Sequence, residues 1–225
     1  ASFGGLKLLN GSLDYTLSGL ATDSITMAKV KGASFIGRDS LEVEVDVVAS
    51  AQTAALYMRG DLPTPGAPQN GTILSSMNLR IAGPRGVVEL QFATATSLNS
   101  IADAVNKVTG LTGVEAELIN GSVNSGLTFS SEEYGSGQFV SVERTNRPTD
   151  ATADSFRLYS FVDNGEIPGA PFPWSSIGSV LTEDNRDEGK DVVALINGAL
   201  ATGKGLQVSV NSPSLAVDLR SEEHT

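Results

Sequence analysis

The chain has 225 residues, a formal net charge of −11 at pH 7 and no cysteine. The lack of cysteine excludes disulfides, thiolate metal sites and cysteine nucleophiles, and a negative surface argues against nucleic-acid and membrane partners because it repels phosphates. Hydrophobic residues make up 40% of the chain and glycine is abundant, which is typical of many short strands joined by turns.

The two ends of the chain are unusual. The chain begins with Ala1 and not with Met, so it is interpreted as an internal fragment in which a missing targeting segment proves nothing. Residues 220–225 resemble a translated sequencing adapter and are predicted to be a non-native tail, with the natural chain continuing differently after about Leu219. The only histidine, His224, lies in this tail and is given no catalytic role.

Residues 40–48 show the clearest strand pattern. Apolar residues alternate with acidic ones, in the order Leu41, Glu42, Val43, Glu44, Val45, Asp46 and Val47. A period of two predicts one strand with a buried apolar face and a solvated acidic face. Nothing nearby supplies a convergent set of oxygen ligands, so the acids are interpreted as edge protection and not as a calcium site.

Residues 59–72 contain three prolines and three glycines and are predicted to be an exposed loop between two structural units. The loop starts with Arg59-Gly60-Asp61, which matches a cell-adhesion tripeptide. Three letters recur often by chance, so an adhesin-like binding module is kept only as an alternative.

A compact β-β-α-β-β-β unit is predicted next. Residues 76–82 and 87–93 form a hairpin turned by residues 83–86. A helix follows, with Thr96 or Ser97 as its cap and Gly110 at its end. Its apolar stripe has helical spacing and is interpreted as a core face: Leu98, Ile101, Ala102, Val105 and Val108. Strands at 114–119, 127–130 and 139–143 complete the unit.

Beyond residue 148, further strands are predicted at 156–162, 191–196, 206–210 and 215–219. The intervening residues 165–174 are rich in proline and end at Trp174. They are interpreted as an ordered loop in preference to a polyproline ligand.

Residues 198–205, GALATGKG, differ by one letter from a phosphate-binding loop, because Gly205 stands where Ser or Thr is required. A phosphate loop must open a helix, whereas residues 206–210 alternate as a strand. The tetrapeptide Leu-Ile-Asn-Gly also occurs twice, at 118–121 and 195–198, each time before another strand. Both copies therefore predict a hairpin with an Asn-Gly turn, and no nucleotide site.

Other reactive constellations are equally weak. Without His224, neither a serine triad nor a histidine metal site can be assembled. Residues 184–189 are similar to a calcium loop, but Arg186 takes a ligand position, and Glu132 and Glu133 would face opposite ways on an extended chain. Three glycosylation sequons, at Asn10, Asn70 and Asn120, are explained by Asn-Gly turns. The sequence therefore predicts no catalytic, cofactor-binding or metal-binding residue and no enzyme.

Several stretches, in this order, resemble bacterial flagellin. Residues 2–12, SFGGLKLLNGS, are similar to a flagellin segment that follows the N-terminal helices. Residues 97–106, 112–116 and 126–135 resemble the flagellin hook IN motif, with Val105-Asn106 at the name-giving Ile-Asn pair. Residues 189–198 and 201–206 resemble a segment common in the outer region of flagellins.

This resemblance implies that residues 1–219 are the surface-exposed central region of an extracellular flagellar filament subunit that supports swimming. Flagellins catalyse nothing, bind no cofactor and polymerise with other flagellin subunits, mainly through terminal helices that are missing here. Some members of the family carry surface glycans. A hook-associated or filament-cap protein is the nearest alternative, because such proteins share the IN module.

The predicted fold is α+β, with mainly antiparallel strands in two small units. Residues 1–58 plus 149–219 are expected to form an outer β-rich domain. Residues 73–147 are expected to be an inserted IN-type module carrying the single amphipathic helix.

Overall fold

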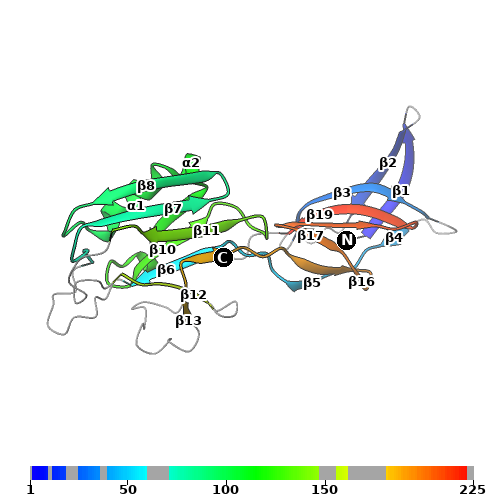
Figure 1. Ribbon diagram of the computed structural model, residues 1–225. Coiled ribbons are helices and arrows are strands. Elements are labelled where there is room, and N and C mark those ends of the chain that lie inside the picture. The colour runs from blue at the N-terminus through cyan, green and yellow to red at the C-terminus, as the bar shows by residue number, and fades with distance from the viewer. Residues whose placement is uncertain are drawn as a thin grey trace. The chain divides into compact units, whose positions relative to one another are not determined.

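The computed structural model describes residues 2–9, 12–18, 25–35, 40–59, 71–146, 156–161 and 181–221 (Figure 1). The chain divides into two compact units. Unit 1 comprises Ala1–Gln52, Tyr134–Ser136 and Lys190–Thr225, and unit 2 comprises Thr53–Glu133 and Gly137–Gly189.

Unit 2 contains two antiparallel sheets and a helix (Figure 1). One sheet has the strand order β13-β12-β6-β10-β9 and the other has the order β14-β11-β7-β8. The strands are β6 (Ala55–Arg59), β7 (Met77–Gly83), β8 (Gly86–Phe92), β9 (Val114–Leu118), β10 (Gly126–Ser131), β11 (Phe139–Arg144), β12 (Leu158–Phe161), β13 (Leu181–Glu183) and β14 (Arg186–Glu188). The helices are α1 (Leu98–Asn106), the short α2 (Thr109–Thr112) and the 3-10 turn η1 (Ile119–Gly121).

Helix α1 packs its predicted apolar stripe into the core of unit 2. Leu98, Ile101, Ala102 and Val105 are buried together with side chains from both sheets, including Leu79 of β7 and Phe129 of β10. Ser97 caps the helix, since its hydroxyl oxygen accepts a hydrogen bond from the Ser100 N–H at 3.2 Å. The interpretation of the stripe as a core face is confirmed for these four residues, whereas Val108, the fifth residue of the predicted stripe, is half-buried and lies beyond the end of α1.

The helix ends earlier than predicted. Helix α1 stops at Asn106, and a separate turn, α2, ends at Gly113, whose φ of 76° is left-handed. Gly110 lies inside α2 and does not end the helix, so the predicted boundary is wrong. Gly113 ends the helical region instead, because glycine adopts the left-handed conformation of a helix C-cap without strain.

The two predicted Asn-Gly turns are confirmed. Asn120 and Gly121 have φ of 53° and 66° in the connection between β9 and β10. Asn197 and Gly198 have φ of 50° and 76° between β15 (Val193–Ile196) and β16 (Ala199–Leu200). Asn197-Gly198 alone joins β15 to β16, whereas Asn120-Gly121 lie in η1 within a longer connection, residues 119–125, between β9 and β10. Both residue types tolerate this left-handed backbone.

Unit 1 contains three further antiparallel sheets. Their strand orders are β2-β1-β4, β16-β15-β5 and β17-β18-β19-β3. The remaining strands are β1 (Ser2–Leu9), β2 (Ser12–Ser18), β3 (Ile25–Ala33), β4 (Ser40–Glu42), β5 (Val45–Ala49), β17 (Thr202–Lys204), β18 (Gln207–Asn211) and β19 (Leu215–Ser221). The core of unit 1 is small and aliphatic, and includes Val43, Ile196, Val217 and Leu219.

The single strand predicted at 40–48 is wrong, because the chain changes sheets in its middle. Strand β4 pairs with β1, and β5 pairs with β15. Between them Val43 is buried, while the Glu44 N–H donates to the Asn197 side-chain oxygen at 2.8 Å. The apolar face is also not buried throughout, since Val47 and Val48 are exposed. An alternating pattern reports local geometry and not which strand supplies the hydrogen bonds.

The expected β-rich, mainly antiparallel architecture is confirmed, although the strands of the described residues form five sheets. Among the described residues, α1 is the one helix longer than a single turn. The assignment of 1–58 plus 149–219 to one domain and 73–147 to another stays a prediction; β6 and β12–β14 pair with strands of unit 2. The predicted tail 220–225 also stays a prediction, with β19 reaching Ser221. Gly60, Asp61, Asn10, Asn70, residues 165–174 and His224 lie outside the described residues.

Candidate functional site

The stretch 198–205 forms strands and turns and does not open a helix. After β15 the chain makes β16, β17 and then β18, so a strand follows Gly205 as the sequence predicts. The Gly205 N–H, which would face phosphate in a nucleotide loop, donates instead to Asp191 Oδ1 at 2.6 Å. The Gly205 N–H is already hydrogen-bonded to the Asp191 carboxylate, and that negative charge would repel a phosphate. The stretch is therefore a structural turn.

Asp191 links two segments of unit 1, because it binds Ser136 as well as Gly205. Besides Gly205, its carboxylate accepts hydrogen bonds from the Ser136 N–H at 3.0 Å and the Ser136 hydroxyl at 2.5 Å. The Ser136 hydroxyl, followed by the Gly205 amide, lowers the pKa of Asp191 because these donors stabilise the ionised form. The arrangement is a structural clamp, since every donor comes from the chain itself.

The carboxylates singled out in the sequence are compensated by arginines. Arg85 lies 2.5 Å from Glu132 and 4.0 Å from Glu133 in these exposed ion pairs. The chain is bent at these two glutamates, so the alternation expected for an extended strand does not apply. Both face the same guanidinium, beside a pocket of about 150 Å³. Both carboxylates therefore lie in surface ion pairs with one arginine.

The loop compared with a calcium site is built differently. The Asp184 carboxylate accepts hydrogen bonds from the N–H groups of Asn185 and Arg186, which closes a tight turn before β14. Arg186 then pairs with Glu188 at 3.0 Å and stacks over the Phe139 ring at 4.2 Å. Across the described ranges, no group of three or more His, Cys, Asp or Glu side chains could hold a metal ion.

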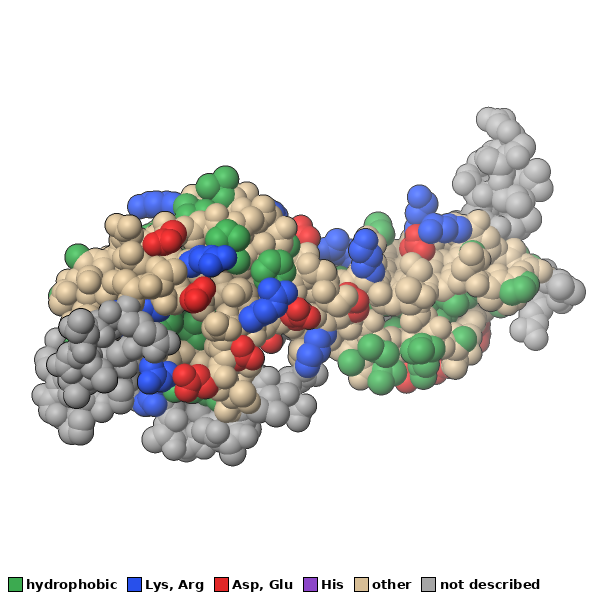
Figure 2. Space-filling view, in the orientation of Figure 1, with side chains coloured by type: hydrophobic (Ala, Val, Ile, Leu, Met, Phe, Trp, Pro, Cys, Tyr) green, Lys and Arg blue, Asp and Glu red, His purple; other side chains and the backbone are tan. Residues whose placement is uncertain are grey.

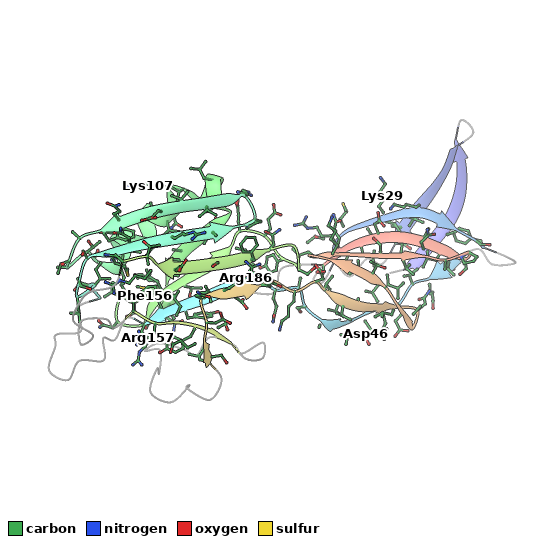
Figure 3. All side chains as sticks on the ribbon, viewed as in Figure 1. Lys29, Asp46, Lys107, Phe156, Arg157 and Arg186 are labelled. Atoms are coloured by element: carbon green, nitrogen blue, oxygen red, sulfur yellow. The ribbon has the colours of Figure 1, made fainter. Side chains whose placement is uncertain are left out.

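A polar cleft of about 480 Å³ lies between β11, β12 and β13. Figure 3 labels Phe156 and Arg157, which line it. Arg157 pairs with Glu183 at 3.3 Å across this surface. The complete lining is Val142, Glu143, Arg144, Phe156, Arg157, Leu158, Glu183, Asp184 and Asn185. Sequence reasoning missed this cleft because three strands distant in sequence assemble it, and the lining offers no nucleophile beside a base.

An exposed apolar patch covers the sheet β16-β15-β5 of unit 1. Val48, Val193 and Leu200 are 61%, 38% and 72% exposed, and Figure 2 shows hydrophobic side chains gathered in this region. The alternating sequence pattern did not predict this patch. Val48 lies where the register between β5 and β15 shifts, and such an irregularity interrupts the alternation of buried and exposed residues.

The most specific polar arrangement lies along β9, an edge strand of unit 2. The Asn106 side chain donates to the Ala116 carbonyl and accepts from the Ala116 N–H, both at 2.8 Å. The Thr109 hydroxyl donates to the Val114 carbonyl at 2.9 Å, and the Thr112 hydroxyl accepts from the Val114 N–H at 3.1 Å. Side chains from α1 and α2 thus take the place of a neighbouring strand.

This arrangement, which we call the β9 edge closure, consists of Asn106, Thr109 and Thr112. Edge strands expose unpaired N–H and C=O groups that recruit other strands, and here the outward groups of Val114 and Ala116 are occupied. Sequence reasoning named Asn106 only as part of the IN pair. The signal it lacked was the spacing of Asn106, Thr109 and Thr112, which are three residues apart and immediately precede a strand.

No helix among the described residues is long and apolar enough to cross a membrane. The adhesion tripeptide is described only at Arg59, which ends β6.

Comparison with known protein families identifies one motif within unit 2. The flagellin hook IN motif matches residues 76–133, which span β7 to the residues just after β10. No curated protein sequence matches the chain.

Several solved structures of flagellar cap proteins are similar to this chain, and one of them has a TM-score above 0.5. The D2-D3 domains of the flagellar cap protein FliD from Escherichia coli are 18% identical, with a TM-score of 0.52 over 92% of this chain and 91% of that chain. The D2-D3 domains of FliD from Serratia marcescens are 18% identical, with a TM-score of 0.49 over 90% and 95% of the two chains. FliD from Pseudomonas aeruginosa PAO1 is also 18% identical, with a TM-score of 0.48 over 86% and 77%. Residues 76–133 therefore match the flagellin hook IN motif, and the fold of the chain is similar to that of the Escherichia coli cap-protein domains.

Proposed function

We propose that this chain is the D2-D3 part of a flagellar filament-cap protein, the alternative raised by the sequence, and not the outer region of a filament flagellin. The observation that carries this proposal is the extent of the likeness to the Escherichia coli cap-protein domains. That likeness covers both units of the chain, whereas the IN motif covers only part of unit 2.

The described side chains fit a structural role in the cap. Carboxylates such as Asp191, Glu132 and Glu188 are engaged by donors or arginines within the fold. A protein whose function is to be assembled needs rigid, internally satisfied surfaces more than a reactive pocket. The proposed role requires no catalytic, cofactor-binding or metal-binding residue, and its partners are other flagellar subunits.

Labelling of intact flagella distinguishes a cap from a filament subunit. Antibodies raised against the purified chain, coupled to gold, are applied to filaments of the bacterium that encodes it. A cap protein is expected to be labelled at the filament tip alone, whereas a filament subunit would be labelled along the whole length. Antibodies against the bacterium's flagellin provide the matched control, and competition with the purified chain must remove the tip signal.

Two results would overturn the proposal. Gold distributed along the whole filament would instead support the hypothesis that the chain is part of a flagellin filament subunit. Gold that is absent from filaments but present elsewhere on the cell surface would favour the adhesin-like module.

A further inference from the structure

We propose that the open edge of the IN motif, strand β8, pairs antiparallel with β8 of a second copy of this chain. This inference concerns self-association of unit 2 and does not depend on whether the chain belongs to a cap or a filament protein. It rests on the difference between the two outer strands of the motif, β9 and β8.

Strand β8 has a neighbour on one side only. It pairs with β7 over its whole length, and in the described part of the chain it is the last strand of its sheet. Val87 is 55% exposed, Val88 is half-buried, and the half-buried Leu90 packs against the core. Among the residues that the structure describes, no side chain is hydrogen-bonded along this edge in the way that Asn106, Thr109 and Thr112 are along β9.

The direction of the β8 backbone groups follows from β7. The Thr145 N–H donates to the Asn78 carbonyl at 2.9 Å, so the backbone groups of Asn78 point toward the β11 side. The backbone groups of successive residues alternate, so Leu79 and Ile81 point toward β8 and bond Leu90 and Val88. Consequently the N–H and C=O groups of Val87, Glu89 and Gln91 point outward, away from the sheet.

A second β8 fits this edge in a self-complementary register. With the two-fold axis at Leu90, Leu90 faces its own copy, and each Glu89 faces Gln91 of the partner copy. The two Glu89–Gln91 pairs would exchange about four backbone hydrogen bonds. Each Glu89 carboxylate then lies opposite an amide that can donate to it, so the polar groups match across the axis.

The competing register places the two-fold axis at Glu89. It would set two carboxylates directly opposite each other at about 5.5 Å between Cα atoms, and like charges in that position destabilise a strand pair. It would also place Val87 opposite Gln91. Glu89 therefore selects the Leu90-centred register and does not simply block the edge.

The β9 edge closure decides what kind of assembly the IN motif can form. A head-to-tail chain of copies would need β8 of one copy to pair with β9 of the next. The outward groups of Ala116 and Val114 on β9 are already hydrogen-bonded to Asn106, Thr109 and Thr112. Of the possible pairings that β8 and β9 could make between copies, only the symmetric pairing of β8 with β8 remains. This pairing uses the same strand in both copies, so it forms a closed dimer.

Residue-resolved amide hydrogen exchange of the unmodified chain, dilute and concentrated, tests the proposal and its register. The amides of Glu89 and Gln91 are expected to exchange several-fold more slowly at high concentration. The Val87 amide should change little, because it would face Ala93, whose carbonyl already accepts from Thr96. The Ala116 amide, on the closed edge, is the internal control and should not respond to concentration.

Two variants sharpen the test. Glu89→Pro removes an outward N–H and no backbone hydrogen bond to β7; it also removes the carboxylate that accepts from the Asn78 side chain at 3.4 Å and the Thr145 hydroxyl at 3.3 Å. Because these two contacts are exposed, the variant should keep the fold and abolish the concentration dependence. Because the chain has no cysteine, Leu90→Cys introduces a single thiol, and facing residues of a non-hydrogen-bonded pair lie close enough for a disulfide. Leu90→Cys should form an oxidised dimer several-fold faster than Gln91→Cys, the matched control.

The proposal is overturned if the β8 amides of the unmodified chain exchange at the same rate at both concentrations. It is also overturned if Glu89→Pro keeps the concentration dependence. Equal protection of Val87, Glu89 and Gln91 would contradict the Leu90-centred register. The exchange measurement needs no variant, so a Leu90→Cys protein that failed to fold would not leave the question open.

Discussion

Replacing Asn106 by alanine removes both hydrogen bonds between its side-chain amide and Ala116, each 2.8 Å long. A hydrogen bond in a protein contributes a net 0.5–1.5 kcal/mol, so two of them predict a loss of about 1–3 kcal/mol in the free energy of unfolding. Alanine is a good helix former, so the substitution should not weaken α1 itself. Water can reach the exposed Asn106 position, which favours the lower half of this range.

The loss is measured by urea unfolding followed by circular dichroism, together with exchange of the Ala116 amide. Lys107→Ala is the matched control, because Lys107 is the exposed next residue and should change stability by no more than about 0.5 kcal/mol. Asn106→Asp keeps the acceptor for the Ala116 N–H but sets a carboxylate against the Ala116 carbonyl, so it should be no more stable than the alanine variant. An Asn106→Ala protein as stable as the Lys107→Ala control, with an unchanged Ala116 amide, would refute the β9 edge closure.

Three further predictions follow from packing and titration. Ile101→Ala, at a fully buried position of α1, should lower the stability of unit 2 by about 2–5 kcal/mol in urea unfolding. Gly203→Ala should prevent normal folding of unit 1, seen as lost amide protection in β15–β18, because a Cβ would overlap the Val192 carbonyl oxygen. Burial, with the charges of Asp187 and Glu117, raises the pKa of Tyr57 to about 12, so the unfolded chain releases this proton first. Stability should therefore fall between pH 10 and 12 by up to about 3 kcal/mol, and Tyr57→Phe should lack this part of the pH dependence.

Local patterns in the sequence predicted those parts of the fold whose partners are close in the chain. The hairpin β7–β8 is joined by two residues, and the stripe of α1 needs only a core on one side. The Asn-Gly turns are likewise decided by the backbone preferences of two adjacent residues. The conformation of each of these elements is determined by residues within the element itself, so its type could be inferred without knowing the remainder of the fold.

The missed features depend on residues that are far apart in sequence. The break at Val43 and Glu44 exists because β4 pairs with β1 while β5 pairs with β15, about 150 residues further on. The polar cleft needs β11, β12 and β13 together. The pairing of Glu132 and Glu133 with Arg85 needs the hairpin turn to meet the end of β10. The hydrophobic periodicity of one segment does not predict which distant segments that segment will contact.

The pair Val105-Asn106 shows how two adjacent residues can serve a core and an edge at once. Successive helical residues point about 100° apart, so Val105 enters the core with no exposure while Asn106 reaches the edge of β9. The first position requires only an apolar side chain of the right size, so valine in place of isoleucine alters little. The second requires one short group that donates and accepts toward the same residue, which asparagine provides and a carboxylate does not. The asparagine is therefore the more constrained member of the pair, and it is the member that this chain keeps.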